Sequence, residues 1–187
     1  MPFKIKRETG DPFETMIDHA RYNDITIFGL KSLFDYGFTL EPRDALIRLV
    51  SQGVRPIIAV SPQFRSIRKV LIAYSGSMES AKAMRRYVQL SPWQNVQLRV
   101  VHFGRSGDDT EQLLEDAGEY CRDHGFNAET ELVDKSAKDH LIEYAQQHDM
   151  DLIVMSNSIR NLILRHLLGD TALNAIRQSD RPLFLAQ

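Results

Sequence analysis

Two hydrophobic periods alternate along this chain of 187 residues. Short continuous apolar runs, typical of buried strands, are separated by longer segments whose apolar residues recur every three or four positions, as on one face of a helix. The predicted strands cover residues 3–7, 25–28, 57–60, 70–74, 96–103, 128–133, 152–155 and 183–186. The predicted helices cover residues 11–20, 45–50, 77–88, 109–124, 136–148 and 164–178. Strands that alternate with helices indicate parallel pairing through right-handed crossovers, so the pattern predicts an α/β layered fold.

The apolar run from Val70 to Tyr74 stops abruptly at Ser75, Gly76 and Ser77, and a helix is predicted directly after it. Such a turn points the N-terminus of a helix outward, where unpaired backbone N–H groups favour an anion. A plain tight turn in which Ser77 caps the helix fits the same residues. The sequence therefore predicts either a ligand loop or a simple capped turn at this point.

The first sixty residues repeat the last sixty. The matching segments are 24–29 with 151–156 at an offset of 127, 55–60 with 181–186 at an offset of 126, and 3–20 with 128–145. Self-similarity of this kind indicates that one structural unit is used twice. We therefore divide the chain into a partial unit at 1–62, a linker at 63–69 and a complete unit with five strands at 70–187.

The partial unit lacks a counterpart of Val70 to Gly125, which holds two strands and two helices. In a doubly wound sheet the first strand is usually central, so its absence leaves an open edge and an uncovered face. We expect the partial unit to pack against the complete unit, or against the same segment of a second chain, in a protein that is at least a dimer. The alternative is a shortened appendage that is only marginally folded.

Composition and charge narrow the class of protein. A formal net charge of -2 gives no overall basic surface, so we expect neither nucleic acid nor a membrane as partner. The chain opens with charged residues rather than a signal peptide, and no apolar run reaches the roughly 18 residues needed to cross a bilayer. Cys121 is the only cysteine; it falls on the apolar stripe of the helix at 109–124, together with Leu113, and is predicted to be buried. A cytoplasmic protein fits these features.

The order of elements, the repeat and the closing motifs resemble the universal stress protein family in its tandem form. The most specific resemblance is at the end of the chain, in the segments 167–171 and 181–185. It implies a Rossmann-like domain, similar to the adenine nucleotide alpha hydrolases, with a doubly wound, five-stranded parallel sheet preceded by a partial repeat of the same module. It also implies a homodimer.

Family members that bind ATP carry an aspartate and Gly-Ser after the first strand, and a loop of the form G-x2-G-x9-G-[S/T] after the fourth. The resemblance implies that ATP or AMP would bind at the corresponding positions of this chain. These are Ala73, Tyr74, Ser75, Gly76, Ser77, Val101, Met155, Ser156, Asn157, Ser158, Gly169, Asp170 and Thr171.

The chain departs from this pattern at several points. Ser75 stands in place of the aspartate, and Ser156 and Ile159 replace the first two glycines of the loop. Asp170 stands where a serine or threonine is expected, so it would place a negative charge beside the phosphates. These changes predict a degenerate site that is weakened, altered or lost.

The resemblance implies a non-enzymatic stress-response protein, with or without a bound adenine nucleotide. One alternative is an ATP-pyrophosphatase-type enzyme, because residues 75–80 are similar to the SGGxDS loop of that group, although the second glycine is missing. Another is a scaffold that binds no nucleotide and pairs through the strand Leu183–Ala186. The six histidines show no metal-ligand spacing, and the sequence identifies no catalytic residue.

Overall fold

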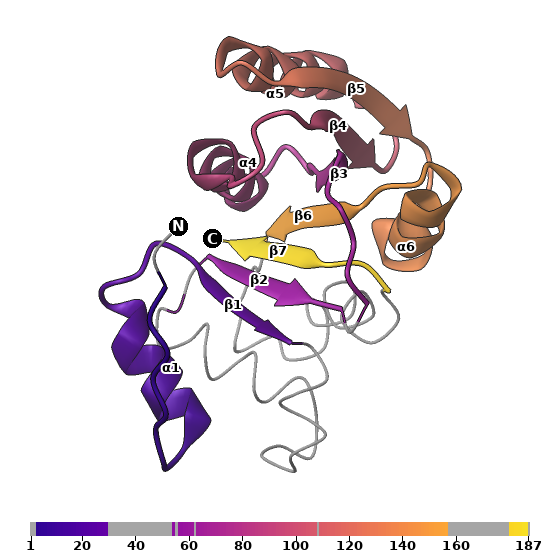
Figure 1. Ribbon diagram of the computed structural model, residues 1–187. Helices are drawn as coiled ribbons and strands as arrows, with labels where there is room; N and C mark the ends of the chain where they lie inside the picture. Colours follow the sequence, from indigo (N-terminus) through magenta and orange to yellow (C-terminus); the bar gives the residue numbers. More distant parts are fainter. Residues whose placement is uncertain are drawn as a thin grey trace, which may run out of the picture.

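The computed structural model describes residues 3–29, 54, 56–61, 63–107, 109–156 and 180–186. Within these residues one seven-stranded sheet runs in the order β1-β2-β7-β6-β3-β4-β5 (Figure 1). The strands are β1 (Thr26–Gly29), β2 (Ile57–Val60), β3 (Lys69–Ala73), β4 (Gln97–Phe103), β5 (Asn127–Val133), β6 (Leu152–Ser156) and β7 (Leu183–Ala186). The helices are α1 (Pro12–Ala20), α4 (Met78–Leu90), α5 (Thr110–Asp123) and α6 (Ala137–Gln147).

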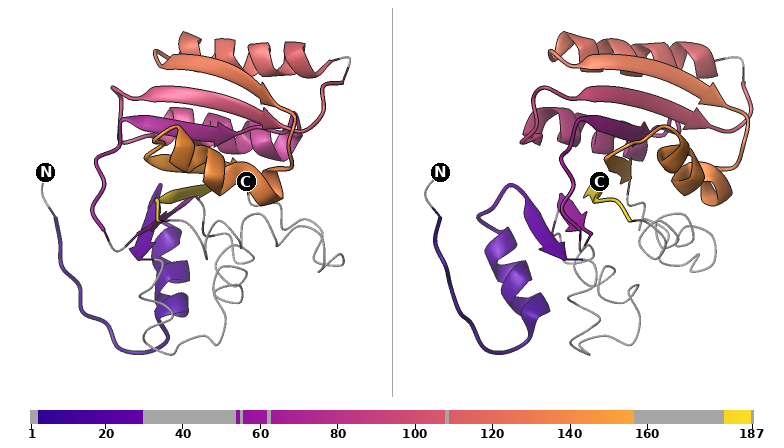
Figure 2. Two further views of the ribbon diagram at one scale, coloured as in Figure 1. Left: turned by 90° about the vertical axis from the view of Figure 1, so that its right-hand side faces the viewer. Right: turned by 45° about the vertical axis from the view of Figure 1, so that its right-hand side comes forward.

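Helices cover both faces of the parallel part of the sheet, which consists of β7, β6, β3, β4 and β5 (Figures 1 and 2). The apolar faces of α4 and α5 pack on one side, together with alternate strand residues such as Val70 and Ile72. The apolar face of α6 packs on the other side, with intervening residues such as Leu71, while α1 lies beside β1 and adds Phe13 to the same cluster. This arrangement confirms the predicted doubly wound, five-stranded parallel sheet.

The first strand pair joins this sheet through β2 and β7, which run antiparallel. Ile58 lies opposite Phe184, and the flanking pairs, Ile57 with Leu185 and Ala59 with Leu183, are symmetric about it. The junction therefore has the geometry of a local two-fold axis. Of the two packing arrangements expected for the partial unit, the structure shows the one within the chain.

The pairing of β1 with β2 has the same register as the pairing of β6 with β7. Thr26 lies opposite Ile57, and Ile153 lies opposite Leu183, which are the positions related by the two sequence offsets. The ladder hydrogen bonds correspond as well. The amide of Thr26 donates to the Pro56 carbonyl at 3.1 Å, and the amide of Ile153 donates to the Pro182 carbonyl at 3.1 Å. This agreement supports the internal repeat.

The predicted role of Leu183–Ala186 as a pairing strand between chains is wrong for this structure. β7 already has β6 on one side and β2 on the other. Both of its edges are therefore occupied within the chain, and no edge is left for a second copy.

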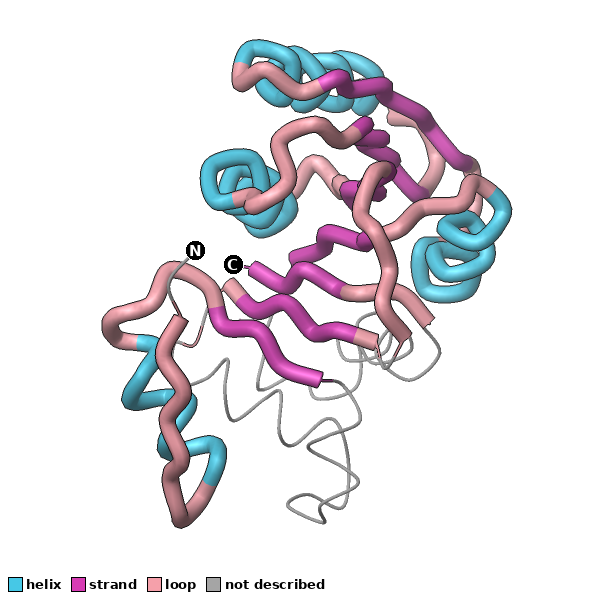
Figure 3. Tube along the Cα trace, viewed as in Figure 1, coloured by secondary structure: helices cyan, strands magenta, loops and turns pink. Residues whose placement is uncertain are grey.

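The predicted strand at residues 3–7 is also wrong. Residues 3–9 are extended but have no regular secondary structure (Figure 3). A strand needs a neighbouring strand that completes its hydrogen-bond ladder. The internal repeat relates residues 3–7 to β5, and β5 pairs with β4. Among the described residues, no strand lies beside residues 3–7 to pair with them. Phe3 and Ile5 are 85% and 78% exposed.

The remaining strands, and the helices now labelled α1, α4, α5 and α6, are confirmed to within a few residues. The helices predicted at 45–50 and 164–178 lie outside the described residues. The division into 1–62, 63–69 and 70–187 stays a prediction, since one sheet includes strands from both predicted units.

Cys121 lies on the buried face of α5 and is fully buried, as predicted. Burial raises the pKa of its thiol from 9.0 to about 12, with Arg122 acting weakly in the opposite direction. Because the folded pKa lies above the unfolded one, the stabilising effect of the buried protonated thiol is complete below about pH 9 and declines as the pH rises towards 12.

We therefore expect the free energy of unfolding to fall with rising pH partly because of this thiol. In Cys121→Ala the titrating group is absent, so the stability difference between wild type and variant should shrink by about 1 kcal/mol between pH 8 and pH 10. Urea denaturation of both proteins at a series of pH values measures this difference. Parallel stability curves would show that the thiol makes no contribution.

Candidate functional site

The strand order reverses between β3 and β6. From β3 the chain moves outward to β4 and β5, and it then returns to place β6 on the opposite side of β3. Ligands of open α/β sheets bind in the crevice that such a reversal opens at the carboxyl ends of the strands. The carboxyl end of β3 leads into the Ser75-Gly76-Ser77 turn, so the predicted ligand loop lies at this position.

Hydrogen bonds among three serines hold the turn between β3 and α4. The hydroxyl of Ser77 caps α4 by accepting from the amide of Ser80 at 3.2 Å. The Ser80 hydroxyl is 2% exposed; it donates to the Ser77 carbonyl at 2.8 Å and accepts from the Ser75 amide at 3.2 Å. Both sequence interpretations therefore agree with the local structure: the turn is capped, and it presents the exposed Ser75 and Ser77 at the N-terminus of a helix.

Gly76 has a positive φ of 74°, a conformation that side chains rarely adopt. A Cβ atom at this position would also approach the Leu113 Cδ1 to 3.4 Å. That distance is an ordinary van der Waals contact, so it is the positive φ, and not the space beside α5, that favours glycine here.

The neighbouring strands supply backbone rather than side chains to the predicted site. The Tyr74 amide donates to the Val101 carbonyl at 2.9 Å, and Val101 is fully buried. On the other side of β3, Met155 is 6% exposed and Ser156 is the last residue of β6. Adjacent strands thus bring together the predicted residues from Ala73 to Ser77, Val101, Met155 and Ser156. The predicted residues Asn157, Ser158, Gly169, Asp170 and Thr171 lie outside the described part of the chain.

Acidic groups lie near the loop as well. Glu79 is in the first turn of α4. Burial and the nearby Asp116 both raise the pKa of Tyr74. The dipole of α4 favours an anion at its N-terminus, whereas these carboxylates oppose one.

Sequence reasoning missed two apolar side chains beside the turn. Met78 is 62% exposed, and Leu113 is 42% exposed. The prediction that Leu113 belongs to the buried stripe of its helix is wrong, because Leu114, Ala117 and Cys121 form the face that packs on the sheet. The spacing of these three residues could have predicted that Leu113 is exposed. Leu113 precedes Leu114 in the helix, so its side chain is rotated by about 100° away from the buried face.

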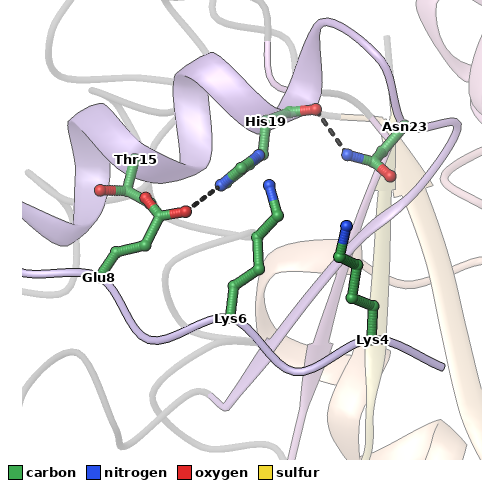
Figure 4. A pocket seen from close by; sticks show the side chains of 6 residues that line it. All are labelled: Lys4, Lys6, Glu8, Thr15, His19 and Asn23. Carbon is green, nitrogen blue, oxygen red and sulfur yellow. Dashed lines mark hydrogen bonds and ion pairs between the residues drawn. The ribbon is translucent and has the colours of Figure 1, made fainter.

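A pocket of about 370 Å³ lies away from this turn, between the extended residues 3–9 and α1 (Figure 4). The residues that line it all carry polar or charged groups: Lys4, Lys6, Glu8, Thr15, His19 and Asn23. His19 Nε2 lies 2.9 Å from Glu8 Oε1, and the Asn23 side-chain amide donates to the His19 carbonyl at 2.6 Å. A strand at residues 3–7, as predicted from the sequence, would have left no such pocket, so the pocket was not expected.

In the part of the chain that the structure describes, no group of three histidine, cysteine or acidic side chains is arranged to bind a metal ion. No helix among the described residues is sufficiently long and apolar to cross a membrane.

Residues 104–187 match the model of the universal stress protein family. One relative, universal stress protein Slr1230 from Synechocystis sp., is 24% identical over 96% of this chain. The chain spans 63% of the length of that relative.

Solved structures share the fold. A universal stress protein from Archaeoglobus fulgidus matches 95% of this chain and 66% of its own, with a TM-score of 0.72 at 17% identity. A universal stress protein in complex with cAMP matches 66% of this chain and 98% of its own, with a TM-score of 0.57 at 23% identity. Residues 104–187 are thus similar to a universal stress protein domain, and the solved structures show that the chain shares the fold of these proteins.

Proposed function

We propose that this chain is a non-enzymatic stress-response protein that binds an adenine nucleotide at the carboxyl ends of β3 and β6. The observation that carries the proposal is the position of the Ser75-Gly76-Ser77 turn at the point where the strand order reverses and α4 begins. The complex of a structural neighbour with cAMP favours an adenine nucleotide over other anions. The exposed Met78 and Leu113 add apolar surface beside the turn.

We further propose that binding is weak and favours AMP over ATP. Glu79 and Asp116 lie near the turn, and Asp170 is expected beside the phosphates from the loop pattern of the family. Each added phosphate brings more negative charge close to these carboxylates, which costs electrostatic energy. The homodimer and the cytoplasmic location expected from the sequence belong to the same proposal.

A pair of substitutions at Ser77 tests the nucleotide site. Ser77→Asp preserves a good helix cap but adds a negative charge, and Ser77→Asn is a neutral control of nearly the same shape that also caps well. We expect Ser77→Asp to weaken AMP binding at least tenfold and Ser77→Asn to change it only slightly, because only the first repels the phosphate. Isothermal titration calorimetry with AMP and ATP measures both, and thermal unfolding without nucleotide verifies that the cap is intact.

The same titrations distinguish the competing functions. AMP binding that is lost only in Ser77→Asp supports the proposal, whereas release of pyrophosphate from ATP would favour the ATP-pyrophosphatase alternative. Wild-type protein whose melting temperature does not respond to millimolar AMP or ATP would contradict nucleotide binding, since a ligand at 100 times its Kd adds about 2.7 kcal/mol of stability.

A further inference from the structure

β1 forms one end of the sheet. Among the described residues it pairs with β2 alone (Figures 1 and 2). The amide of Thr26 donates to the Pro56 carbonyl, so the backbone groups of Thr26 face inward. Successive residues of a strand direct their N–H and C=O groups to opposite sides, so those of Ile27 face away from β2. Ile27 thus presents a donor and an acceptor along the outer edge.

Although β1 is short, its described residues carry neither of two features that commonly protect a sheet edge, charge and proline. Its sequence, Thr-Ile-Phe-Gly, contains no charged residue and no proline. The Ile27 side chain is also 61% exposed. An uncharged, apolar strand edge of this kind is a template for pairing with another strand.

The opposite end of the sheet provides an internal comparison. β5 carries Glu129 and Glu131, which form ion pairs with Arg99 of β4 at 3.2 and 3.6 Å. If two β5 strands paired, these acids would face like charges in the second copy, which disfavours association. The two ends of one sheet therefore differ: β5 is protected by charge, and β1 is not.

The internal repeat identifies what β1 lacks. β6, the strand that corresponds to β1 in register, has β3 on its second side. β1 has no such neighbour among the described residues. The chain already joins two units by an antiparallel pair with local two-fold symmetry, at β2 and β7. A second antiparallel pair of the same kind would satisfy the β1 edge.

We propose that β1 is the dimer interface: it pairs antiparallel with β1 of a second copy of this chain, with Ile27 opposite Ile27 of the partner subunit. An isologous pair suits this strand because its edge is uncharged and two copies do not repel each other. The inference specifies the surface of the homodimer in the proposed function. Its failure is distinguishable from failure of the nucleotide site, because Ser77 and Ile27 are tested by different readouts.

Light scattering coupled to size exclusion tests the interface. The wild-type protein should have twice the 21.5 kDa mass of the chain. Ile27→Lys should weaken association at least tenfold and give a monomer, because it places two like charges opposite each other on the edge. Phe64→Lys is the matched control: Phe64 is 97% exposed outside the sheet, so this variant should remain a dimer. Monomeric wild-type protein, or a dimer that persists in Ile27→Lys, would overturn the proposal.

A disulfide test locates the contact independently. Cys121 is the only native cysteine and is fully buried, so it should not react with the oxidant. Ile27→Cys therefore adds the one accessible thiol of the variant. With copper phenanthroline as oxidant, two such thiols lose their protons and two electrons and form one S–S bond across the two-fold axis. We expect a covalent dimer that dithiothreitol reverses, and no such product from Phe64→Cys at the same concentration. Equal cross-linking of both variants would indicate random collision and contradict the interface.

Discussion

Replacing Ile58 with aspartate is expected to lower the free energy of unfolding by about 4 kcal/mol or more. Ile58 is 1% exposed in β2, between β1 on one side and β7 on the other. An aspartate at this position would place a carboxylate in the apolar layer under α4 and α5, where the surrounding cluster is hydrophobic. The variant must either bury this charge, protonate it or release β2 from the sheet, and each outcome costs stability.

The matched control carries the same substitution on the neighbouring strand. Ile27 lies directly opposite Ile58 in the β1–β2 ladder but is 61% exposed, so Ile27→Asp should lose less than about 1 kcal/mol. Urea denaturation, at a protein concentration low enough to keep the chain monomeric, compares the two. Similar losses for both variants would contradict the burial of Ile58 between β1 and β7.

Replacing Phe184 with alanine is expected to lower the free energy of unfolding by about 3–5 kcal/mol. Phe184 is fully buried in β7 and lies opposite Ile58 at the local two-fold axis. Its ring contacts Tyr87 of α4 edge to face, with ring centroids 5.3 Å apart. Truncation would leave a cavity at the point where β2, β7 and α4 meet, and the rigid strands around it cannot collapse to fill the space.

Phe64→Ala is the control for this prediction, since Phe64 is 97% exposed and its truncation should change stability by less than about 0.5 kcal/mol. Chemical denaturation of both variants gives the comparison. A loss below about 1 kcal/mol for Phe184→Ala would mean that β7 is not packed as described.

The local pattern of apolar residues was sufficient to predict most strands of the sheet. The predicted strands at 183–186 and 96–103 agree with β7 and β4 to within one residue, because a buried parallel strand needs an unbroken apolar run wherever it occurs. The segment at 3–7 shows the limit of such patterns. Its alternation of Phe3, Lys4, Ile5 and Lys6 satisfies the strand period, but a strand also needs a partner, and partners are set by the whole topology.

The sequence also left open which strand pairs with β7 on the side away from β6. A second chain and the partial unit of the same chain present equivalent strands, so the sequence alone could not distinguish them. The tether favours the internal strand, since a linked segment has a high effective concentration. At the candidate site, the serines and Gly76 identified the turn. The exposure of Leu113 was missed because the spacing of apolar residues in a helix does not show which residues at the border of the apolar face are buried.

One contact joins the two strand groups of this fold, the antiparallel pairing of β2 and β7 within a single chain. The amides of Thr26 and Ile153 donate to Pro56 and Pro182, so the backbone groups of Ile58 and Phe184 face β1 and β6. The Ile58–Phe184 pair is therefore non-hydrogen-bonded, the type in which opposing Cα atoms approach to about 4.5 Å.

Nuclear magnetic resonance tests this contact directly. We predict a strong Overhauser effect between the Hα protons of Ile58 and Phe184, and it should be absent from isotope-filtered spectra of mixed labelled and unlabelled chains, which report only contacts between molecules. No cross-peak between these protons, or one that appears only between chains, would contradict the fold described.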